Sequence, residues 1–223
     1  MGVKPILFSG SMVRALLEGR KTMTRRVLKP QPGEGFDFLG IYAPGLTAVF
    51  SDGNPDNDLT YRLHSRGDLL WVREALDMGH KYGGKAHGFP ICTCTYQANA
   101  APVDLTPIGA AQWAGERQRN SIPGIHMPRN LSRLTLEVTE VRVERVQDIT
   151  ARDVSAEGVI LPKLSNGLTV YHTGQAQTAF RTLWNSLNEK RGYGWDANPW
   201  VVATSFKVHH QNVDAFLAER EAA

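Results

Sequence analysis

A cluster of basic residues near the N-terminus is the part of the sequence whose residue types and spacing are best suited to chemistry. Between positions 14 and 29 there is one acidic residue, Glu18, and there are six basic ones: Arg14, Arg20, Lys21, Arg25, Arg26 and Lys29. Lysine and arginine side chains near a helix end and a turn often bind phosphate groups. The formal net charge is +3, which permits a nucleic-acid partner without requiring one. The cluster is therefore the first candidate for a functional site.

A helix and a strand are predicted to position this cluster. Apolar residues recur at helical spacing over residues 11–18, and Gly19 is placed to end that helix. The following residues, 22–28, are predicted to form a strand. Other elements are predicted from apolar periodicity and turn residues, namely strands over 46–50, 69–74, 92–96, 134–146 and 200–208, and helices over 150–158, 176–190 and 214–222. At the first of these helices, Thr150 with Asp153 resembles a capped helix start, and Gly158 is placed to end the helix.

Two features of the remaining sequence bear on the fold. In the strand at 134–146, apolar residues lie on even positions before Thr139 and on odd positions after Glu140, which predicts a bulge, a bend or a break. The glycine-rich residues 77–90 and most of 99–130 are predicted to be loop, with a helical piece near 110–117. Several non-adjacent strands with short helices between them favour an α+β or β-barrel-like single domain.

Composition excludes several classes of protein. Of the 223 residues, 42% are hydrophobic and 21% charged, which is typical of a globular chain with a real core. No apolar run is long enough to span a membrane, and residues 1–7 lack the features of a signal peptide, so we expect a cytoplasmic protein. Cys92 and Cys94 are too close in sequence for an unstrained disulfide, which excludes a secreted disulfide scaffold.

The segment Gly19-Arg20-Lys21-Thr22-Met23-Thr24 resembles the Gly-x-Lys-x-x-Thr signature of the ASCH family. Four further segments resemble longer, often bacteriophage-encoded, ASCH proteins: Leu70-Trp71-Val72-Arg73-Glu74, Ile125-His126-Met127-Pro128-Arg129, Ser132-Arg133-Leu134-Thr135-Leu136-Glu137 and Trp195-Asp196-Ala197-Asn198-Pro199-Trp200. The resemblance implies a PUA-like β-barrel with flanking short helices and loop insertions. We expect one domain over residues 1–223, with a loop-rich insertion at 77–120 and a terminal helix within 211–223.

The resemblance also implies an activity. One ASCH group, the bacterial N(4)-acetylcytidine amidohydrolases, uses a lysine and a threonine of the signature and a glutamate on a following strand. The matching positions are Lys21, Thr24 and Glu74. A threonine hydroxyl needs a neighbouring base, a lysine serves as base only when its pKa is lowered, and the leaving amine needs an acid. The leading hypothesis is therefore a metal-independent hydrolase of an acylated cytidine or a related modified nucleoside, with Lys21 as base, Thr24 as nucleophile and Glu74 as acid.

The alternative hypothesis is a binding module for RNA or a modified base, without chemistry. In it the cluster residues Arg20, Arg25 and Arg26 contact phosphates, and the predicted substrate-binding residues outside the cluster are Trp71, Arg73, His126 and Arg129. For Trp71 a core position, and for Arg73 a structural ion pair, are the competing interpretations. A third hypothesis is a phage protein that binds a host partner.

No cofactor or metal is expected. The sequence contains neither a phosphate-binding glycine-rich loop nor a dinucleotide fingerprint, which disfavours an ATPase or a dehydrogenase. One set of potential zinc ligands lies in the glycine-rich segment, namely His80, His87, Cys92 and Cys94. Their spacing matches no standard zinc signature, so zinc binding is only a pattern-based alternative.

Overall fold

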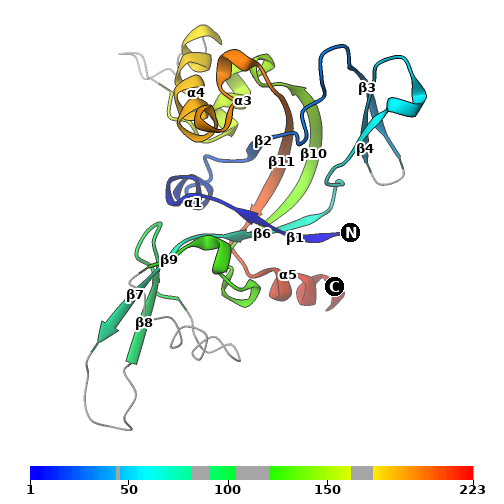
Figure 1. Cartoon of the computed structure of the whole chain (residues 1–223). Coiled ribbons are helices and arrows are strands. Elements are labelled where there is room, and N and C mark those ends of the chain that lie inside the picture. Colours follow the sequence, from blue (N-terminus) through cyan, green and yellow to red (C-terminus); the bar gives the residue numbers. More distant parts are fainter. Residues whose placement is uncertain (44–45, 82–90, 104–120, 162–172, 223) are drawn as a thin grey trace. The chain divides into compact units, whose positions relative to one another are not determined.

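The protein is a mixed α+β fold in a computed structural model that describes residues 1–43, 46–81, 91–103, 121–161 and 173–222. The chain divides into two compact units, each assembled from three segments. Unit 1 consists of residues 1–2, 19–68 and 138–207, and unit 2 of residues 3–18, 69–137 and 208–223. Neither unit is a continuous piece of chain, because the polypeptide passes several times from one to the other. Figure 1 follows this path by colour.

The main sheet has the strand order β1-β6-β10-β11-β2. In unit 2, β1 (Val3–Leu7) is parallel to β6 (Leu69–Arg73), and β6 is antiparallel to the first residues of β10 (Thr135–Arg145). In unit 1, β2 (Met23–Val27) is antiparallel to β11 (Trp200–His209), with Thr24 opposite Thr204. The signature segment therefore enters the edge strand of this sheet.

Each unit also contains a small antiparallel sheet. In unit 1 the order is β3-β4-β5, from Asp37–Tyr42, Thr47–Ser51 and Leu59–Arg62. In unit 2 the order is β8-β7-β9, from Ile91–Tyr96, Leu76–Lys81 and Ser121–Ile122.

Helices complete the two units. Unit 1 contains α3 (Ala151–Ala156) and α4 (Thr173–Asn188), which pack through a core that includes Phe180, Trp184 and Trp195. Unit 2 contains α1 (Gly10–Leu17) and α5 (Val213–Ala222). Single 3₁₀ turns lie at Pro55–Asn57, Gly124–His126, Arg129–Leu131, Val146–Asp148, Glu189–Arg191 and Trp195–Ala197. No helix of the described ranges is both long enough and apolar enough to cross a membrane.

Most elements predicted from local patterns are confirmed. The helix predicted over 11–18 is α1, and Gly19 follows it with a left-handed φ of 70°, a conformation that glycine adopts without strain. The strands predicted over 22–28, 46–50, 69–74, 92–96 and 200–208 and the terminal helix match β2, β4, β6, β8, β11 and α5 within one or two residues.

The structure differs from the sequence prediction in several places, and the strands β1, β3, β5 and β9 were not predicted. The glycine-rich segment from residue 77 begins as strand, because β7 pairs with β8 as far as Lys81. The strand β3 was not predicted, because a register shift between Phe38 and Gly40 interrupts its alternation. Of the three alternatives predicted for residues 134–146, the break is excluded, because β10 is one strand from Thr135 to Arg145; its buried apolar residues change from even positions (Leu136, Val138) to an odd one (Val143) as predicted. The helix predicted near 110–117 lies outside the described residues.

The helix α3 begins with the predicted capping interaction. The Thr150 hydroxyl accepts a hydrogen bond from the Asp153 amide at 3.1 Å, and the Asp153 carboxylate accepts one from the Thr150 amide at 3.4 Å. This reciprocal pair satisfies two amides that have no partner within the helix. It also fixes the carboxylate of Asp153 on the first turn, and Gly158 ends the helix with a φ of 84°.

We expect Thr150→Ala to lower the free energy of unfolding by about 1 kcal/mol, because it removes the acceptor of the helix cap. Urea denaturation followed by circular dichroism measures this loss. Thr182→Ala is the matched control, since Thr182 lies exposed inside α4, where alanine is the better helix former. Equal stability of wild type and Thr150→Ala would contradict the capping role.

Candidate functional site

The signature segment is anchored in unit 1 through its backbone. The amide of Thr22 donates to the Ala156 carbonyl at 2.8 Å, and the Thr22 carbonyl accepts from the Phe206 amide at 2.9 Å. Lys21 and Glu157 form an isolated antiparallel bridge. The segment thus lies between the end of α3 and the strand β11, and its side-chain directions follow from these contacts.

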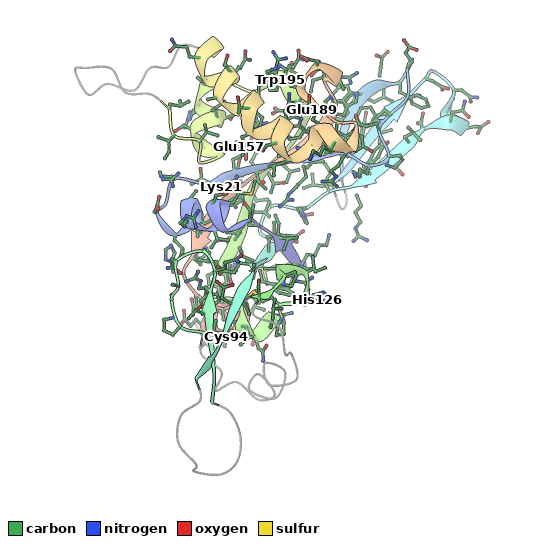
Figure 2. All side chains as sticks on the ribbon, turned by 60° about the vertical axis from the view of Figure 1, so that its left-hand side comes forward. Lys21, Cys94, His126, Glu157, Glu189 and Trp195 are labelled. Carbon is green, nitrogen blue, oxygen red and sulfur yellow. The ribbon has the colours of Figure 1, made fainter. Side chains whose placement is uncertain are left out.

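Lys21 is a buried lysine whose ammonium is held by one carboxylate. Its side chain is 1% exposed, and Nζ donates to Glu157 Oε2 at 2.7 Å and to the Glu157 carbonyl oxygen at 2.9 Å. Figure 2 shows the two labelled residues near each other. Burial lowers the pKa of Lys21 below its ordinary value of 10.5, and the Glu157 carboxylate offsets only part of this effect. A neutral lysine is therefore more accessible here than on a surface.

Arg25 shares that carboxylate and two others. Its fully buried guanidinium donates from Nη1 to Glu157 Oε1 at 3.3 Å and from Nη2 to Asp153 Oδ2 at 2.9 Å. It also donates from Nε and Nη2 to Glu144 Oε1 at 3.0 and 2.6 Å. Arg25 was predicted to contact phosphate, but in this arrangement its donors point to carboxylates and its side chain has no exposed surface.

Arg142 completes this charge network. It donates to Asp153 Oδ1 at 3.1 Å and lies 3.8 Å from Glu144 Oε2. The network comprises three cations and three carboxylates: Lys21, Arg25 and Arg142 with Glu144, Asp153 and Glu157. Because the formal charges balance, burial of the central arginine leaves no net charge in the interior.

Two opposing influences act on the pKa of the Asp153 carboxyl: burial, and its positively charged and hydrogen-bonding neighbours. Burial by itself raises the pKa of this carboxyl. The charges of Arg25 and Arg142 and the hydrogen bonds from Thr150 outweigh burial, so the pKa of Asp153 lies below its ordinary value. Asp153 is therefore an ionised carboxylate in the folded protein at neutral pH.

A polar cleft of about 470 Å³ adjoins the network in unit 1. It is lined by Thr22, Met23, Thr139, Glu140, Arg142, Thr150, Arg152, Asp153, Ala156, Ser205 and Phe206. The polar lining consists of four hydroxyl side chains, two arginines and two carboxylates, and the Nε of Arg142 is buried without a hydrogen-bond partner. This polar cleft has the donors to hold an oxygen-rich or anionic ligand.

Thr24 takes the opposite direction from Lys21 and Arg25. In β2 the side chains alternate, so Thr24 faces away from Met23 and Arg25, whose Sδ and Nη1 atoms lie 3.1 Å apart. Thr24 is 3% exposed and lies opposite the buried Thr204. The structure brings Lys21 and Arg25 together on Glu157 and places Thr22, not Thr24, in the lining of the polar cleft.

The other two cluster residues that are predicted to contact phosphate, Arg20 and Arg26, are exposed. Arg20 donates from Nη1 to the Gly158 carbonyl at 2.8 Å, next to the end of α3. Arg26 alternates onto the same face of β2 as Thr24 and is exposed to solvent. Both side chains have surface available for a phosphate, in contrast to Arg25.

Glu74 lies in unit 2, whereas Lys21 and Thr24 lie in unit 1. Its carboxylate is 1% exposed and accepts two hydrogen bonds from the Arg133 guanidinium, at 2.9 Å each. The same guanidinium lies 3.8 Å above the ring of Tyr96. The Glu74 carboxylate is therefore engaged in a bidentate ion pair with Arg133 within unit 2.

The remaining predicted binding residues also lie in unit 2. Arg73 donates to the Ile125 carbonyl and lies 5.4 Å from the ring of the half-buried Trp71. Arg129 pairs with Asp214. His126 is exposed at the end of a 3₁₀ turn. Arg73 and Arg129 therefore make structural contacts within unit 2, with the Ile125 carbonyl and the Asp214 carboxylate respectively.

Sequence reasoning missed the acidic residues of the site. Asp153 was noted only as a helix cap, and Glu144 and Glu157 were not singled out. Glu157 is 136 positions from Lys21 and 132 from Arg25. No local sequence pattern predicts an ion pair between residues so far apart in the chain. The excess of cations in the signature segment does imply that acidic partners exist if the segment is buried, because buried charges need partners.

The zinc alternative stays a prediction. His87 lies outside the described residues, and of the other three side chains only that of Cys94, which is buried, is described. Within the described ranges, no group of three or more histidine, cysteine, aspartate or glutamate side chains is arranged to hold a metal ion.

Comparison of the chain with protein-family models, with curated proteins and with solved structures gives no match.

We expect Arg25→Met to lower the free energy of unfolding by about 3–5 kcal/mol, because three carboxylates lose their shared cation. Arg152→Met is the matched control: Arg152 is exposed and adjacent to Asp153, so its replacement is expected to change stability by less than about 0.5 kcal/mol. Urea denaturation of both variants tests this, and similar losses in the two would contradict the network's importance.

The lowered pKa of Asp153 predicts a specific acid sensitivity. A carboxyl that ionises more readily in the folded state stabilises the fold above its unfolded pKa of about 3.9, and this stabilisation is lost as the pH falls through the lowered folded value. Asp153→Asn should therefore flatten the decline of stability below about pH 4. Asp56→Asn, at an exposed position, is the control and should retain the wild-type pH profile.

Proposed function

We propose that the chain is an ASCH protein of PUA-like fold that removes an acyl group from a modified cytidine, with Lys21 as general base. The observation that carries this proposal is the environment of Lys21: a lysine 1% exposed, with a lowered pKa, whose neighbour in the chain, Thr22, lines the polar cleft. A general base must be available in its neutral form near the working pH, and desolvation is the usual way in which a lysine achieves this.

The proposed reaction converts N(4)-acetylcytidine and water into cytidine and acetate. Lys21 takes a proton from a threonine hydroxyl, whose oxygen attacks the acyl carbon. The amide C–N bond breaks, the cytosine amine leaves with a proton from an acid, and water then hydrolyses the threonine ester. The resemblance assigns the hydroxyl to Thr24 and the acid to Glu74.

The contacts of Lys21 support a second assignment of the two partner roles. Thr22 lines the polar cleft, and Glu157 is hydrogen-bonded to the lysine itself. A proton accepted by Lys21 can be shared with the Glu157 carboxylate across 2.7 Å. Thr22 and Glu157 are therefore tested beside Thr24 and Glu74.

A binding module without chemistry is the second candidate function, and the lining of the polar cleft favours it. Arg142 and Arg152 lie there among four hydroxyl side chains and the carboxylates of Glu140 and Asp153, and the arginines and hydroxyls supply donors for sugar and phosphate oxygens. Binding of RNA through such contacts weakens steeply as salt concentration rises.

We expect the purified protein to release cytidine from N(4)-acetylcytidine, measured by liquid chromatography. Lys21→Arg is the decisive variant, because arginine keeps the positive charge beside Glu157 but does not deprotonate. It should lower kcat by about 100-fold or more if Lys21 is the base. Unchanged kcat in Lys21→Arg would contradict the role of base.

Two matched pairs assign the remaining roles. Thr22→Val and Thr24→Val each remove one hydroxyl at nearly constant volume, and the nucleophile is the threonine whose loss abolishes cytidine release. Glu74→Gln and Glu157→Gln distinguish the two acids in the same way. Absence of cytidine release, together with RNA binding that declines with salt, would favour the binding module.

A further inference from the structure

A second cleft in unit 1, distinct from the polar cleft, has a volume of about 480 Å³. Its walls are mostly valine and leucine side chains, among them Leu28, Leu63 and Val202, and its polar lining includes Lys29, Tyr61 and Arg62. All four residues of β5 line this cleft, so side chains from both faces of the strand take part. This is possible because β5 is an edge strand of the small sheet. The volume lies within the range of about 300–1,000 Å³ typical of small-molecule sites. This region is called the apolar cleft below.

Tyr61 is the polar group buried in its wall. The residue is 8% exposed, and its hydroxyl is buried with no hydrogen-bond partner. The ring packs edge-on against Phe50, with centroids 5.6 Å apart. Burial raises the pKa of the phenol, so it remains a donor at neutral pH. A buried hydroxyl without a partner costs about 1–3 kcal/mol, and a bound ligand is one way to recover that energy.

The charged residues of the apolar cleft are all basic. Lys29 and Arg62 are both exposed, and the described residues that line the cleft include no acid. Lys29 Nζ also lies 4.8 Å from the centre of the Tyr193 ring, which holds the lysine near the surface of the unit. The cleft therefore combines an apolar wall, one buried hydroxyl and two cations.

From this combination we infer that the apolar cleft binds a planar heteroaromatic ring linked to an anionic group, the chemistry of a nucleoside monophosphate. The ring faces contact the valine and leucine side chains, an edge oxygen or nitrogen pairs with the Tyr61 hydroxyl, and the phosphate pairs with Arg62 and Lys29. A fatty acid would satisfy the cations but leave the hydroxyl unpaired.

This inference is independent of the proposed hydrolase activity. None of the residues that line the apolar cleft belongs to the charge network or to the polar cleft. Failure of cytidine release would leave the inference intact, and failure of nucleotide binding at the apolar cleft would leave the role of Lys21 intact.

Isothermal titration calorimetry with CMP and AMP tests the inference on the full chain, with cytidine, adenosine and inorganic phosphate as partial ligands. We expect saturable binding of at least one nucleotide, and binding at least about tenfold weaker for its nucleoside, which lacks the charged group. A 5′-phosphorylated trinucleotide distinguishes the end of an RNA strand from a free mononucleotide as the source of the same chemistry.

Four variants locate the binding. Arg62→Gln should weaken nucleotide binding about tenfold, and Tyr61→Phe about threefold to tenfold. The matched controls are Arg66→Gln, an exposed arginine that does not line the cleft, and Tyr42→Phe, an exposed tyrosine, and both should bind like wild type.

Folding of the test variant can be verified separately. Tyr61→Phe removes an atom that has no partner, so its thermal stability should equal or exceed that of wild type. Absence of saturable binding by both nucleotides, or binding that Tyr61→Phe and Arg62→Gln leave unchanged, would overturn the inference.

Discussion

The sharing of the Glu157 carboxylate between Lys21 and Arg25 is the interaction on which the rest of unit 1 depends. Each oxygen of this carboxylate faces a different cation, at 2.7 and 3.3 Å. Charges removed from water are tolerated only when their partners have good geometry, so the end of α3 must stay in register with the start of β2. The capping interaction of Thr150, the backbone bond from Thr22 to Ala156 and the balancing of Arg25 by Glu144 and Asp153 all maintain that register.

The same constraint explains why a lysine and an arginine four positions apart in the chain have different roles. Arg25 is fully buried with a planar set of donors directed to three carboxylates, which suits a side chain that remains charged. Lys21 has one carboxylate and a carbonyl oxygen, and burial lowers its pKa. The arginine stabilises the fold, and the lysine is the group whose protonation can change.

Unit 1 thus combines two clefts of similar volume and different chemistry. The polar cleft is lined by hydroxyls and by members of the charge network, whereas the apolar cleft has hydrophobic walls, a buried phenol and two cations at its surface. The first suits chemistry or recognition at polar atoms, and the second suits burial of a flat ring. Because they share no lining residue, substitutions in one leave the chemistry of the other in place.

The sequence by itself determined the elements whose signals are local. The apolar spacing before Gly19 indicated α1, the Thr150–Asp153 pair indicated the start of α3, and the change of parity near residue 139 appeared in the burial of β10. It did not determine β3, where a register shift interrupts the alternation, or the strand within the glycine-rich segment, which depends on pairing with β8. The resemblance singled out Lys21, but only the tertiary structure gave it Glu157. Two charges 136 positions apart meet through folding of the whole unit, and no local period encodes that contact.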